Sequence, residues 1–492
     1  MSRTVRKDVR DCENFAGGEW RAPRSGLSLD VTNPSTGAVI GRVGISLAED
    51  VADVVSRARE AARPWAETPM KERVRPLRRF HQLVEQGASD LSNLVAMESG
   101  KTVAEALAGI ERGLEVVEFA LGLPNADVGG ALDVSRGVSC EYRREPLGVV
   151  AGVTPFNFPA MVPLWMFPIA LAVGNAFVLK PSEKVPLTAC RLAELMAESG
   201  LPAGLFSVVH GDRRTVEALV DHPDIRAVGF VGSSAAAKSV YVRATTLGKR
   251  ALCLGGAKNH LIVAPDADEA ITVKGVVDSF TGCAGQRCMA GSVLVVVGDA
   301  ARFVTPIVEA AKSIGVGTKM GAIIDAAARD RLVRAVAKAD SDGATVLLDG
   351  RDPRPPPGGE RGHFFGPTVL DGVRPEMECA KVELFGPILA VIHVPTLDDA
   401  LALERASPYG NATAIFTTSG AVASHVVDHA TSGMVGINVG VPVPRDPFSF
   451  GGTKESKFGH GDITGPGGVE LWSNLKKVTT KWAPSKDANW MS

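Results

Sequence analysis

Cys288 lies in a glycine-rich stretch whose residue types suit nucleophilic chemistry. Residues 280–290 read F-T-G-C-A-G-Q-R-C-M-A, so Gly282 and Gly285 allow close backbone turns and Arg287 directly precedes the cysteine. A thiol held beside a cation on an exposed turn can ionise near neutral pH, and the thiolate is the nucleophile. We therefore predict a nucleophilic Cys288, while a small packed cysteine remains the alternative at this point.

Alternating strand and helix patterns must position this residue. Apolar runs and helical periodicity alternate from residue 148 to residue 244, which predicts a parallel, doubly wound sheet with right-handed crossovers. A second α/β alternation follows Cys288. The predicted strands are 148–153, 176–179, 206–209, 227–231, 293–297, 368–370, 388–394 and 413–417, and the predicted helices are 47–62, 70–86, 90–120 with a break near 98–100, 162–173, 186–198, 214–221, 235–244, 303–314 and 326–340.

Composition narrows the class of protein. The chain has 492 residues, 45% hydrophobic and 22% charged, with a formal net charge of -2. That balance is typical of a soluble globular protein and gives no reason to expect nucleic acid or an anionic membrane as a partner. The most apolar segment, 161–173, is too short to span a membrane. We therefore expect no membrane or nucleic-acid partner and no metal site.

The cysteine count and the N-terminus predict a cytoplasmic location. Seven cysteines in a chain of this length are sparse and odd in number, which argues against a disulfide framework and fits a reducing compartment. Residues 1–12 mix four basic with two acidic side chains and lack the hydrophobic region of a signal peptide.

Polar residues follow three of the predicted parallel strands. Residues 154–157 follow the first strand, Lys180 and Glu183 follow the second, and Ser233 follows the fourth and opens a helix, where free N–H groups favour a phosphate. Doubly wound sheets bind ligands at these strand ends, so together the three sites favour a dinucleotide. No G-x-G-x-x-G follows a strand, and helix caps or turns are the alternative for any single site.

The chain resembles the aldehyde dehydrogenase superfamily over about residues 15–482. The resemblance rests on T-P-F-N-F-P at 154–159, L-K-P-S-E at 179–183, F-V-G-S at 230–233, G-Q-R-C at 285–288 and E-L-F-G-P at 383–387. Residues 155–165, 254–260 and 285–290 are similar to one branch, the CoA-acylating methylmalonate- and malonate-semialdehyde dehydrogenases.

This resemblance implies roles for individual residues. Cys288 matches the catalytic nucleophile, and Asn157 matches the amide that forms an oxyanion hole with the Cys288 backbone N–H. Glu383 matches the carboxylate on the nicotinamide ribose, although a solvated loop acid is the alternative. The positions that match the surroundings of NAD are Thr154, Phe156, Lys180, Glu183, Lys184, Ser233 and Gly255.

One departure from the hydrolytic relatives points to the acyl acceptor. Those relatives carry a glutamate directly before Leu-Gly-Gly, whereas this chain has Cys253 there and no acid between Arg250 and Pro265. A thioester without a general base should react slowly with water. The resemblance therefore implies CoA as co-substrate, and Cys253 itself is interpreted as a packed strand cysteine.

Two arginines match positions that this branch directs at a substrate carboxylate. Arginine binds carboxylates in an oriented, bidentate way, so Arg287 and Arg112 become candidate substrate-binding residues for an anionic aldehyde. The alternative for Arg287 is support of the cysteine loop. For Arg112 it is a helix ion pair with Glu115 or Glu118.

The resulting hypothesis is NAD-dependent oxidation of methylmalonate or malonate semialdehyde through a Cys288 thioester. Decarboxylation and transfer to CoA would give propionyl-CoA or acetyl-CoA. A hydrolytic, NAD(P)-dependent dehydrogenase of succinate semialdehyde or a sulfonated aldehyde is the alternative, and a non-catalytic scaffold is a third class.

The expected fold is an α/β aldehyde dehydrogenase fold, with a Rossmann-type cofactor domain, an α/β catalytic domain and a small β oligomerisation element. We expect an NAD-binding domain over 13–135 and 148–255, a catalytic domain over 256–450, and oligomerisation strands over 136–147 and 468–483. The strand-like segments 138–144 and 469–480 lie outside both alternations and need partners. We therefore expect a homo-oligomer, either a dimer or a tetramer.

Overall fold

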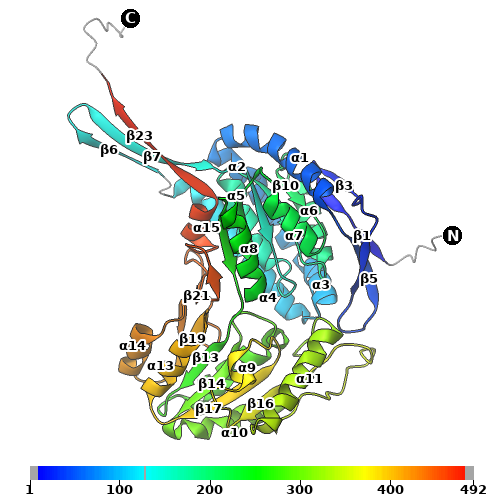
Figure 1. The fold of residues 1–492 in the computed structure, drawn as a ribbon, viewed down its shortest axis with the longest axis vertical. Coiled ribbons are helices and arrows are strands. Elements are labelled where there is room, and N and C mark those ends of the chain that lie inside the picture. Colours follow the sequence, from blue (N-terminus) through cyan, green and yellow to red (C-terminus); the bar gives the residue numbers. More distant parts are fainter. Residues whose placement is uncertain (1–8, 127–128, 483–492) are drawn as a thin grey trace, which may run out of the picture.

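The structure is a computed structural model, and it describes residues 9–126 and 129–482. Two α/β lobes lie one above the other, and a β arm projects from the upper lobe (Figure 1). Cys288 follows helix α9 (Glu269–Thr281) and lies three residues before the first residue of strand β14 (Gly291–Val297) of the lower lobe.

An eight-stranded sheet forms the upper lobe, in the order β22-β12-β11-β8-β9-β10-β2-β3. The five central strands, β12 to β10 in that order, run parallel, and the strands at both edges pair antiparallel. The first predicted alternation is therefore confirmed. The strands are β2 (Asn14–Ala16), β3 (Glu19–Arg21), β8 (Val149–Val153), β9 (Ala176–Lys180), β10 (Phe206–Val208), β11 (Ile225–Val231), β12 (Arg250–Leu254) and β22 (Lys457–Phe458).

Eight helices among the described residues accompany this sheet. Helix α5 is apolar on every side and is buried from Val162 to Ala172, as expected for a helix without a polar face. The predicted break near residue 100 is confirmed, because Gly100 ends α3 with a φ of 77° and Thr102 caps α4. The helices are α1 (Ala48–Glu67), α2 (Met70–Gln86), α3 (Ala88–Ser99), α4 (Val103–Gly122), α5 (Met161–Ala172), α6 (Pro186–Glu198), α7 (Arg213–Asp221) and α8 (Ser234–Thr246).

A seven-stranded sheet forms the lower lobe, in the order β15-β16-β17-β14-β13-β19-β20. All its pairs are parallel except β15 with β16. The second predicted alternation is therefore also confirmed. Its elements are β13 (Asn259–Val263), β14 (Gly291–Val297), α10 (Val304–Lys312), α11 (Ala326–Ser341), β15 (Thr345–Leu348), β16 (Thr368–Asp371), α12 (Glu378–Lys381), β17 (Ile388–Val394), α13 (Leu397–Ala406), β19 (Ala412–Phe416), α14 (Gly420–His429) and β20 (Met434–Ile437).

Four helices of this lobe, α9, α12, α13 and α14, were not predicted, yet three of them, α9, α13 and α14, begin at a capping residue. Asp268, Thr396 and Ser419 accept hydrogen bonds from the backbone N–H groups three residues further on. A side-chain oxygen at this position satisfies an N–H that the helix leaves without a partner. The caps were therefore the sequence signal that could have located these helices.

A three-stranded sheet, β23-β7-β6, forms the projecting arm. β7 (Val138–Pro146) pairs antiparallel with β23 (Ser473–Lys481) over its whole length and with β6 (Gly129–Ser135) on its other side. The predicted strand over 469–480 is wrong at its start, because α15 (Gly465–Leu471) occupies those residues and is opened by a proline. β6 was missed. Six of its seven residues are exposed, so no buried face marked it in the sequence.

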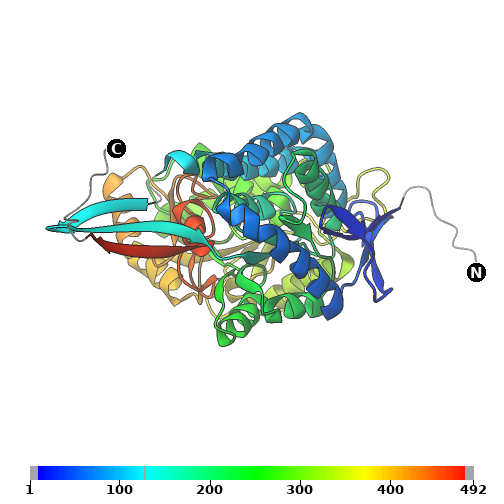
Figure 2. The same cartoon turned by 90° about the horizontal axis from the view of Figure 1, so that it is seen from above.

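A smaller sheet in the order β1-β5-β4 lies at the opposite end of the molecule from the arm (Figure 2). It consists of β1 (Arg10–Cys12), β5 (Val39–Gly44) and β4 (Ser28–Thr32). A two-stranded pair, β18 (Tyr409–Gly410) with β21 (Thr453–Lys454), completes the sheets of the described residues. The predicted domain boundary at 255/256 falls between β12 and β13, and the division into domains stays a prediction. Across residues 9–126 and 129–482, no helix combines the length and apolarity needed to cross a bilayer.

Candidate functional site

The backbone before Cys288 turns through three consecutive left-handed residues. Cys283, Ala284 and Gly285 have φ values of 54°, 51° and 66°. For the two non-glycine residues this conformation costs about 1–2 kcal/mol each, so surrounding contacts must hold it. Gly285 cannot carry a side chain here, because a Cβ would lie 2.2 Å from the carbonyl of Gly386.

Hydrogen bonds from distant segments hold this loop. Glu105 at the start of α4 accepts from the Cys283 N–H at 2.5 Å. Gln286 donates to the Ala322 carbonyl at 3.1 Å and accepts from the Ile324 N–H at 3.0 Å. These hydrogen bonds hold the left-handed turn at residues 283–285 in place and offset its conformational strain.

Two further amides orient the nucleophile itself. The side chains of Asn259 and Asn411 both donate to the Cys288 carbonyl, at 2.7 and 2.9 Å. A carbonyl that accepts two side-chain N–H groups fixes the peptide that carries the thiol. Neither asparagine was predicted as a site residue, although Asn259 lies within the segment 254–260 that carries part of the family resemblance.

Asn157 lies against the same loop. It comes from the segment after β8, is buried, and donates through Nδ2 to the Gln286 carbonyl at 2.9 Å. An amide nitrogen carries two N–H groups, so a second donor remains for another acceptor. The structure thus brings Asn157 and Cys288 together from the two lobes, while the oxyanion role of Asn157 stays a prediction.

The thiol of Cys288 is harder to ionise than its neighbours in the sequence suggested. Although the side chain is partly exposed, desolvation by its surroundings, together with the nearby charge of Glu383, raises the pKa of Cys288 to about 12. Arg287 and Lys101 only partly oppose these effects. The expectation of ionisation near neutral pH is therefore wrong for this structure, because loss of hydration outweighs the adjacent cation.

Arg287 supports the loop in this structure. Its guanidinium donates to the backbone carbonyls of Asp278 and Ser279, the latter at 3.1 Å, near the C-terminal end of α9. Cations are favourable at that end because the last carbonyls lack helical partners. This geometry matches the alternative interpretation of Arg287, and its role toward a substrate carboxylate stays a prediction.

Arg112 is also engaged by the protein. It pairs with Glu115 on the next turn of α4 at 3.2 Å, and Glu115 accepts from Arg445 at 3.0 Å. The helix ion pair considered as the alternative is thus present. A substrate carboxylate would have to replace Glu115 as the partner of Arg112.

A cavity of about 10 Å³ connects Cys288 with Glu383. Glu383 accepts from the Ala257 N–H at 2.9 Å, and its second oxygen lies over Gly256, where a Cβ would come within 2.3 Å. Desolvation raises the pKa of Glu383 to about 7, opposed by that hydrogen bond and by the charges of Lys258 and Arg331. Neither basic residue was predicted as part of the site.

The residues expected around a dinucleotide surround the ends of β8, β9 and β11. Lys180 pairs with Glu183 at 3.2 Å, and burial lowers its pKa. Ser233 caps α8 through the Ala236 N–H. Thr154 carries a buried hydroxyl without a hydrogen-bond partner among the described residues.

Lys184 and Phe156, two more of the residues expected around a dinucleotide, lie next to each other, and Lys184 reaches the lower lobe. Lys184 pairs with Asp325 at 2.6 Å and lies over the ring of Phe156, 5.5 Å from its centre. A Cβ on Gly255 would lie 2.7 Å from the Ser234 hydroxyl. The buried Thr154 hydroxyl without a partner fits a polar ligand such as a dinucleotide. The crowding at Gly255 comes from the protein itself.

Cys253 is a packed strand cysteine, as interpreted from the sequence. It is fully buried in β12, pairs with Phe230 and Phe458, and burial raises its pKa to about 12. It therefore cannot replace a carboxylate as a general base.

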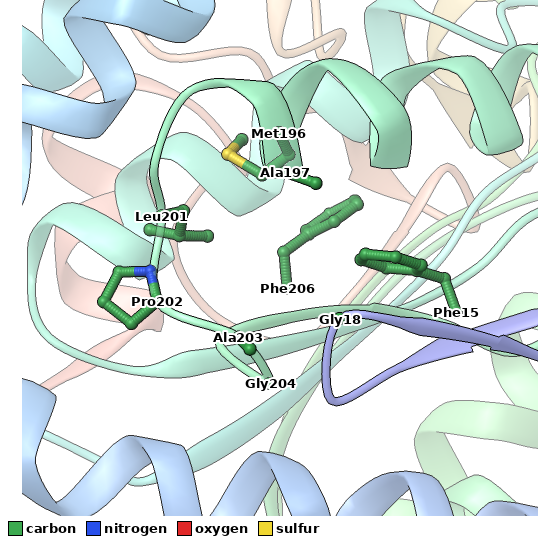
Figure 3. A pocket seen from close by; sticks show the side chains of 9 residues that line it. All are labelled: Phe15, Gly18, Met196, Ala197, Leu201, Pro202, Ala203, Gly204 and Phe206. Atoms are coloured by element: carbon green, nitrogen blue, oxygen red, sulfur yellow. The ribbon is translucent and has the colours of Figure 1, made fainter.

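A cavity larger than the one at Cys288 lies elsewhere in the molecule. Its volume is about 170 Å³ and apolar side chains such as Met196, Leu201 and Phe206 surround it (Figure 3). No titratable or nucleophilic group is among its described lining residues, so its chemistry does not compete with the site at Cys288.

Comparison with known proteins identifies the family. The model of the aldehyde dehydrogenase family matches residues 20–478. The chain belongs to the aldehyde dehydrogenase family. It is 44% identical over 480 residues to the malonate-semialdehyde dehydrogenase 1 of Geobacillus kaustophilus, covering 96% of this chain and 97% of that one.

Two other relatives extend this result. The mitochondrial, acylating methylmalonate-semialdehyde dehydrogenase of Arabidopsis thaliana is 44% identical over 476 residues, 95% of this chain and 78% of that one. A structure from Sinorhizobium meliloti, described as a methylmalonate-semialdehyde dehydrogenase complexed with NAD, superposes with a TM-score of 0.95 at 40% identity, covering 97% and 99% of the chains. The predicted family and the aldehyde dehydrogenase fold are confirmed.

Proposed function

We propose that this aldehyde dehydrogenase oxidises malonate or methylmalonate semialdehyde with NAD and passes the acyl group to CoA. Two features together carry the proposal. Asn157 lies against the loop of Cys288, and the position at which hydrolytic relatives have a glutamate is occupied by the buried Cys253. The relatives named for these semialdehydes, one of them named as acylating, support the substrate and the acceptor.

In the proposed acylation half, the Cys288 thiol gives its proton to solvent water and its sulfur forms a bond to the aldehyde carbon. The carbonyl oxygen gains charge in that step, and Asn157 with the Cys288 N–H stabilises it. Such a donor typically contributes about 3–4 kcal/mol to transition-state stabilisation. Asn259 and Asn411 hold the Cys288 peptide in place while the charge develops.

When bound, NAD would supply the hydride acceptor for the carbon attached to Cys288, and Cys288 would then carry the acyl group as a thioester. Thr154, Lys180, Glu183, Ser233 and Gly255 would hold its adenosine and phosphate portion, and Glu383 its nicotinamide ribose. Phe156 and Lys184 would border the same channel. A solved relative complexed with NAD supports this cofactor.

In the deacylation half, the thioester needs an acceptor better than water. Burial leaves Cys253 neutral and apolar in character, so no acid at that position activates a water molecule. A carboxylate β to the thioester carbonyl can leave as carbon dioxide, and CoA would then release propionyl-CoA or acetyl-CoA. Arg112 and Arg287 are the proposed partners of the substrate carboxylate.

One assay tests this proposal. Purified protein is incubated with NAD and malonate semialdehyde, with and without CoA, while NADH and the acyl product are followed. We expect sustained turnover only with CoA and acetyl-CoA as product. Equal NADH formation without CoA, yielding a free acid, would instead establish the hydrolytic alternative, and succinate semialdehyde would then be tested as substrate.

Two further properties belong to this proposal. We infer that the arm pairs with another copy of the chain, because its outer strands β6 and β23 each offer an unpaired edge among the described residues. A cytoplasmic location stays a prediction from the sparse cysteines and the N-terminal composition.

A further inference from the structure

Glu383 is the only acidic side chain among the described residues that line the cavity at Cys288. One of its oxygens is held by the Ala257 N–H, and none of the hydrogen bonds between described residues uses the other oxygen. The carboxyl group is therefore fixed at one atom and available at the second. It also lies close enough to Cys288 for its charge to oppose ionisation of the thiol.

We propose that Glu383 is the general base that takes the proton from the acceptor thiol when that thiol attacks the Cys288 thioester. This inference rests on the proposed function, because it needs CoA as the acyl acceptor. The hydrolytic relatives have their deacylating glutamate at the position of Cys253. In this chain the proposed base, Glu383, lies instead on the loop between α12 and β17.

The step balances without any oxidant or reductant. The CoA sulfur forms a bond to the thioester carbon while its proton moves to Glu383. The bond from that carbon to the Cys288 sulfur then breaks, and the proton passes from Glu383 to that sulfur. The products are acyl-CoA, a Cys288 thiol and the Glu383 carboxylate with which the step began.

The pKa values of Glu383 and Cys288 favour proton transfer from the acceptor thiol through Glu383 to the Cys288 sulfur. The pKa of Glu383 is raised to about 7 by desolvation, close to the value of about 8.5 for a thiol in water. A base works best when its pKa lies near the working pH. The pKa of Cys288 is about 12, so the leaving sulfur recovers the proton from Glu383 readily.

The same values make Glu383 a poor base for Cys288 itself. A proton would have to move from a group with a pKa of about 12 to one with a pKa of about 7. The charged and titratable groups that face Glu383 are Lys258, Arg331, Cys288 and Tyr409. Lys258 and Arg331 lower its pKa, but desolvation outweighs them.

An experiment without NAD tests thiolysis of the acyl-enzyme separately from the predicted contact of Glu383 with the nicotinamide ribose. p-Nitrophenyl propionate acylates Cys288 directly, and the burst of p-nitrophenol counts the acyl-enzyme. CoA is then added and propionyl-CoA is measured over time between pH 6 and 10. For Glu383→Gln we expect an unchanged amplitude of the burst and thiolysis slower by about 100-fold at pH 7.

The pH profile separates a base from a structural role. Wild-type thiolysis should rise through pH 7 as Glu383 ionises, because only the carboxylate accepts a proton. The Glu383→Gln defect should shrink above about pH 8.5, where the thiol ionises unaided. A defect of constant size at every pH would overturn the proposal.

Three controls complete the test. Glu378→Gln makes the same chemical change at an exposed position on α12 and should leave thiolysis unchanged. The small thiol N-acetylcysteamine should show the same Glu383→Gln defect, whereas a defect confined to CoA would mean that Glu383 only binds CoA and would overturn the base role. Glu383→Asp should recover part of the rate.

The outcomes also distinguish this inference from the proposed function. If CoA fails to release propionyl-CoA from the wild-type acyl-enzyme, the proposed function is wrong and this inference falls with it. If the wild type reacts and Glu383→Gln reacts equally fast at pH 7, only the role of Glu383 is overturned.

Discussion

At the scale of residues, the cations around Cys288 serve different purposes. Arg287 caps α9 through backbone carbonyls, and Arg112 pairs with Glu115. Lys101 is buried, its ammonium lies 3.9 Å from the centre of the Phe158 ring, and it has no hydrogen-bond partner among the described residues. An ammonium that has lost its hydration is costly, and here its charge acts on the Cys288 thiol.

Lys101→Met should therefore change the reactivity of the thiol. Lys101 lowers the pKa of Cys288, so its removal raises that pKa and reduces the thiolate fraction at pH 8. We expect inactivation by iodoacetamide at pH 8 to slow in proportion to the lost thiolate, because the thiolate is the reacting form. The rate of inactivation is measured with excess reagent from pH 7 to pH 11.

The stability of the same variant provides the control. Replacing a buried ammonium without hydrogen-bond partners among the described residues by a thioether of similar length should leave the free energy of unfolding equal or higher. A large loss of stability in urea denaturation would show that Lys101 holds the fold, and unchanged alkylation would show that its charge does not reach Cys288.

At the scale of elements, the start of α4 does two things at once. Glu105 completes the capping box with Thr102, and its other oxygen accepts from the Cys283 N–H of the strained loop. The helix terminus and the loop before Cys288 are thereby joined through one carboxylate. Asp399 occupies the equivalent position in the capping box of α13, where no contact with the loop is present among the described residues.

This pair of capping acids gives a matched prediction. Asp399→Ala should lower the free energy of unfolding by about 1 kcal/mol, since it removes a cap interaction. Glu105→Ala should lower it by about 1 kcal/mol more, because it also leaves the Cys283 N–H without its acceptor. Only Glu105→Ala should also slow acylation of Cys288, because the left-handed turn at Cys283 loses its hydrogen bond. Urea denaturation and the p-nitrophenol burst measure the two effects. Equal burst rates in the two variants would contradict the proposed link.

At the scale of the whole molecule, the two sheets contribute different parts of the site. Asn157 follows a strand of the eight-stranded sheet, whereas Cys288 precedes a strand of the seven-stranded sheet. The arm lies away from both, and its β6 and β23 carry exposed leucines at positions 132 and 475. Exposed apolar residues on unpaired strand edges are typical of an interface with another chain.

Charges on the arm should therefore change the assembly. We expect the double variant Leu132→Asp with Leu475→Asp to sediment as a smaller species than the wild type, because burying a carboxylate in an interface is unfavourable. Sedimentation velocity measures the mass. Leu29→Asp places the same charge on an exposed leucine of β4, at the opposite end, and should leave the mass unchanged. An unaltered mass in the arm variant would argue against an arm-mediated oligomer.

The sequence by itself determined the order of the elements and the candidates for chemistry. Strand and helix periodicities are local, so the predicted bounds of α2 and α6 agree with the structure. Most parallel strands of both lobes were also predicted, but β13 and β20 were not. Cys288, Asn157 and Glu383 could be named because their neighbours in the chain form recognisable motifs. Short amphipathic helices such as α13 and the exposed strand β6 gave too weak a pattern.

Only the tertiary structure decided how these candidates behave. Desolvation depends on residues brought together from distant parts of the chain, so the pKa of Cys288 rises although an arginine precedes it. The partners of Arg287 and Arg112 likewise depend on where each side chain can reach in space. Glu383 became a candidate base because folding places its carboxylate in the cavity of a cysteine 95 positions away, counting from 288 to 383.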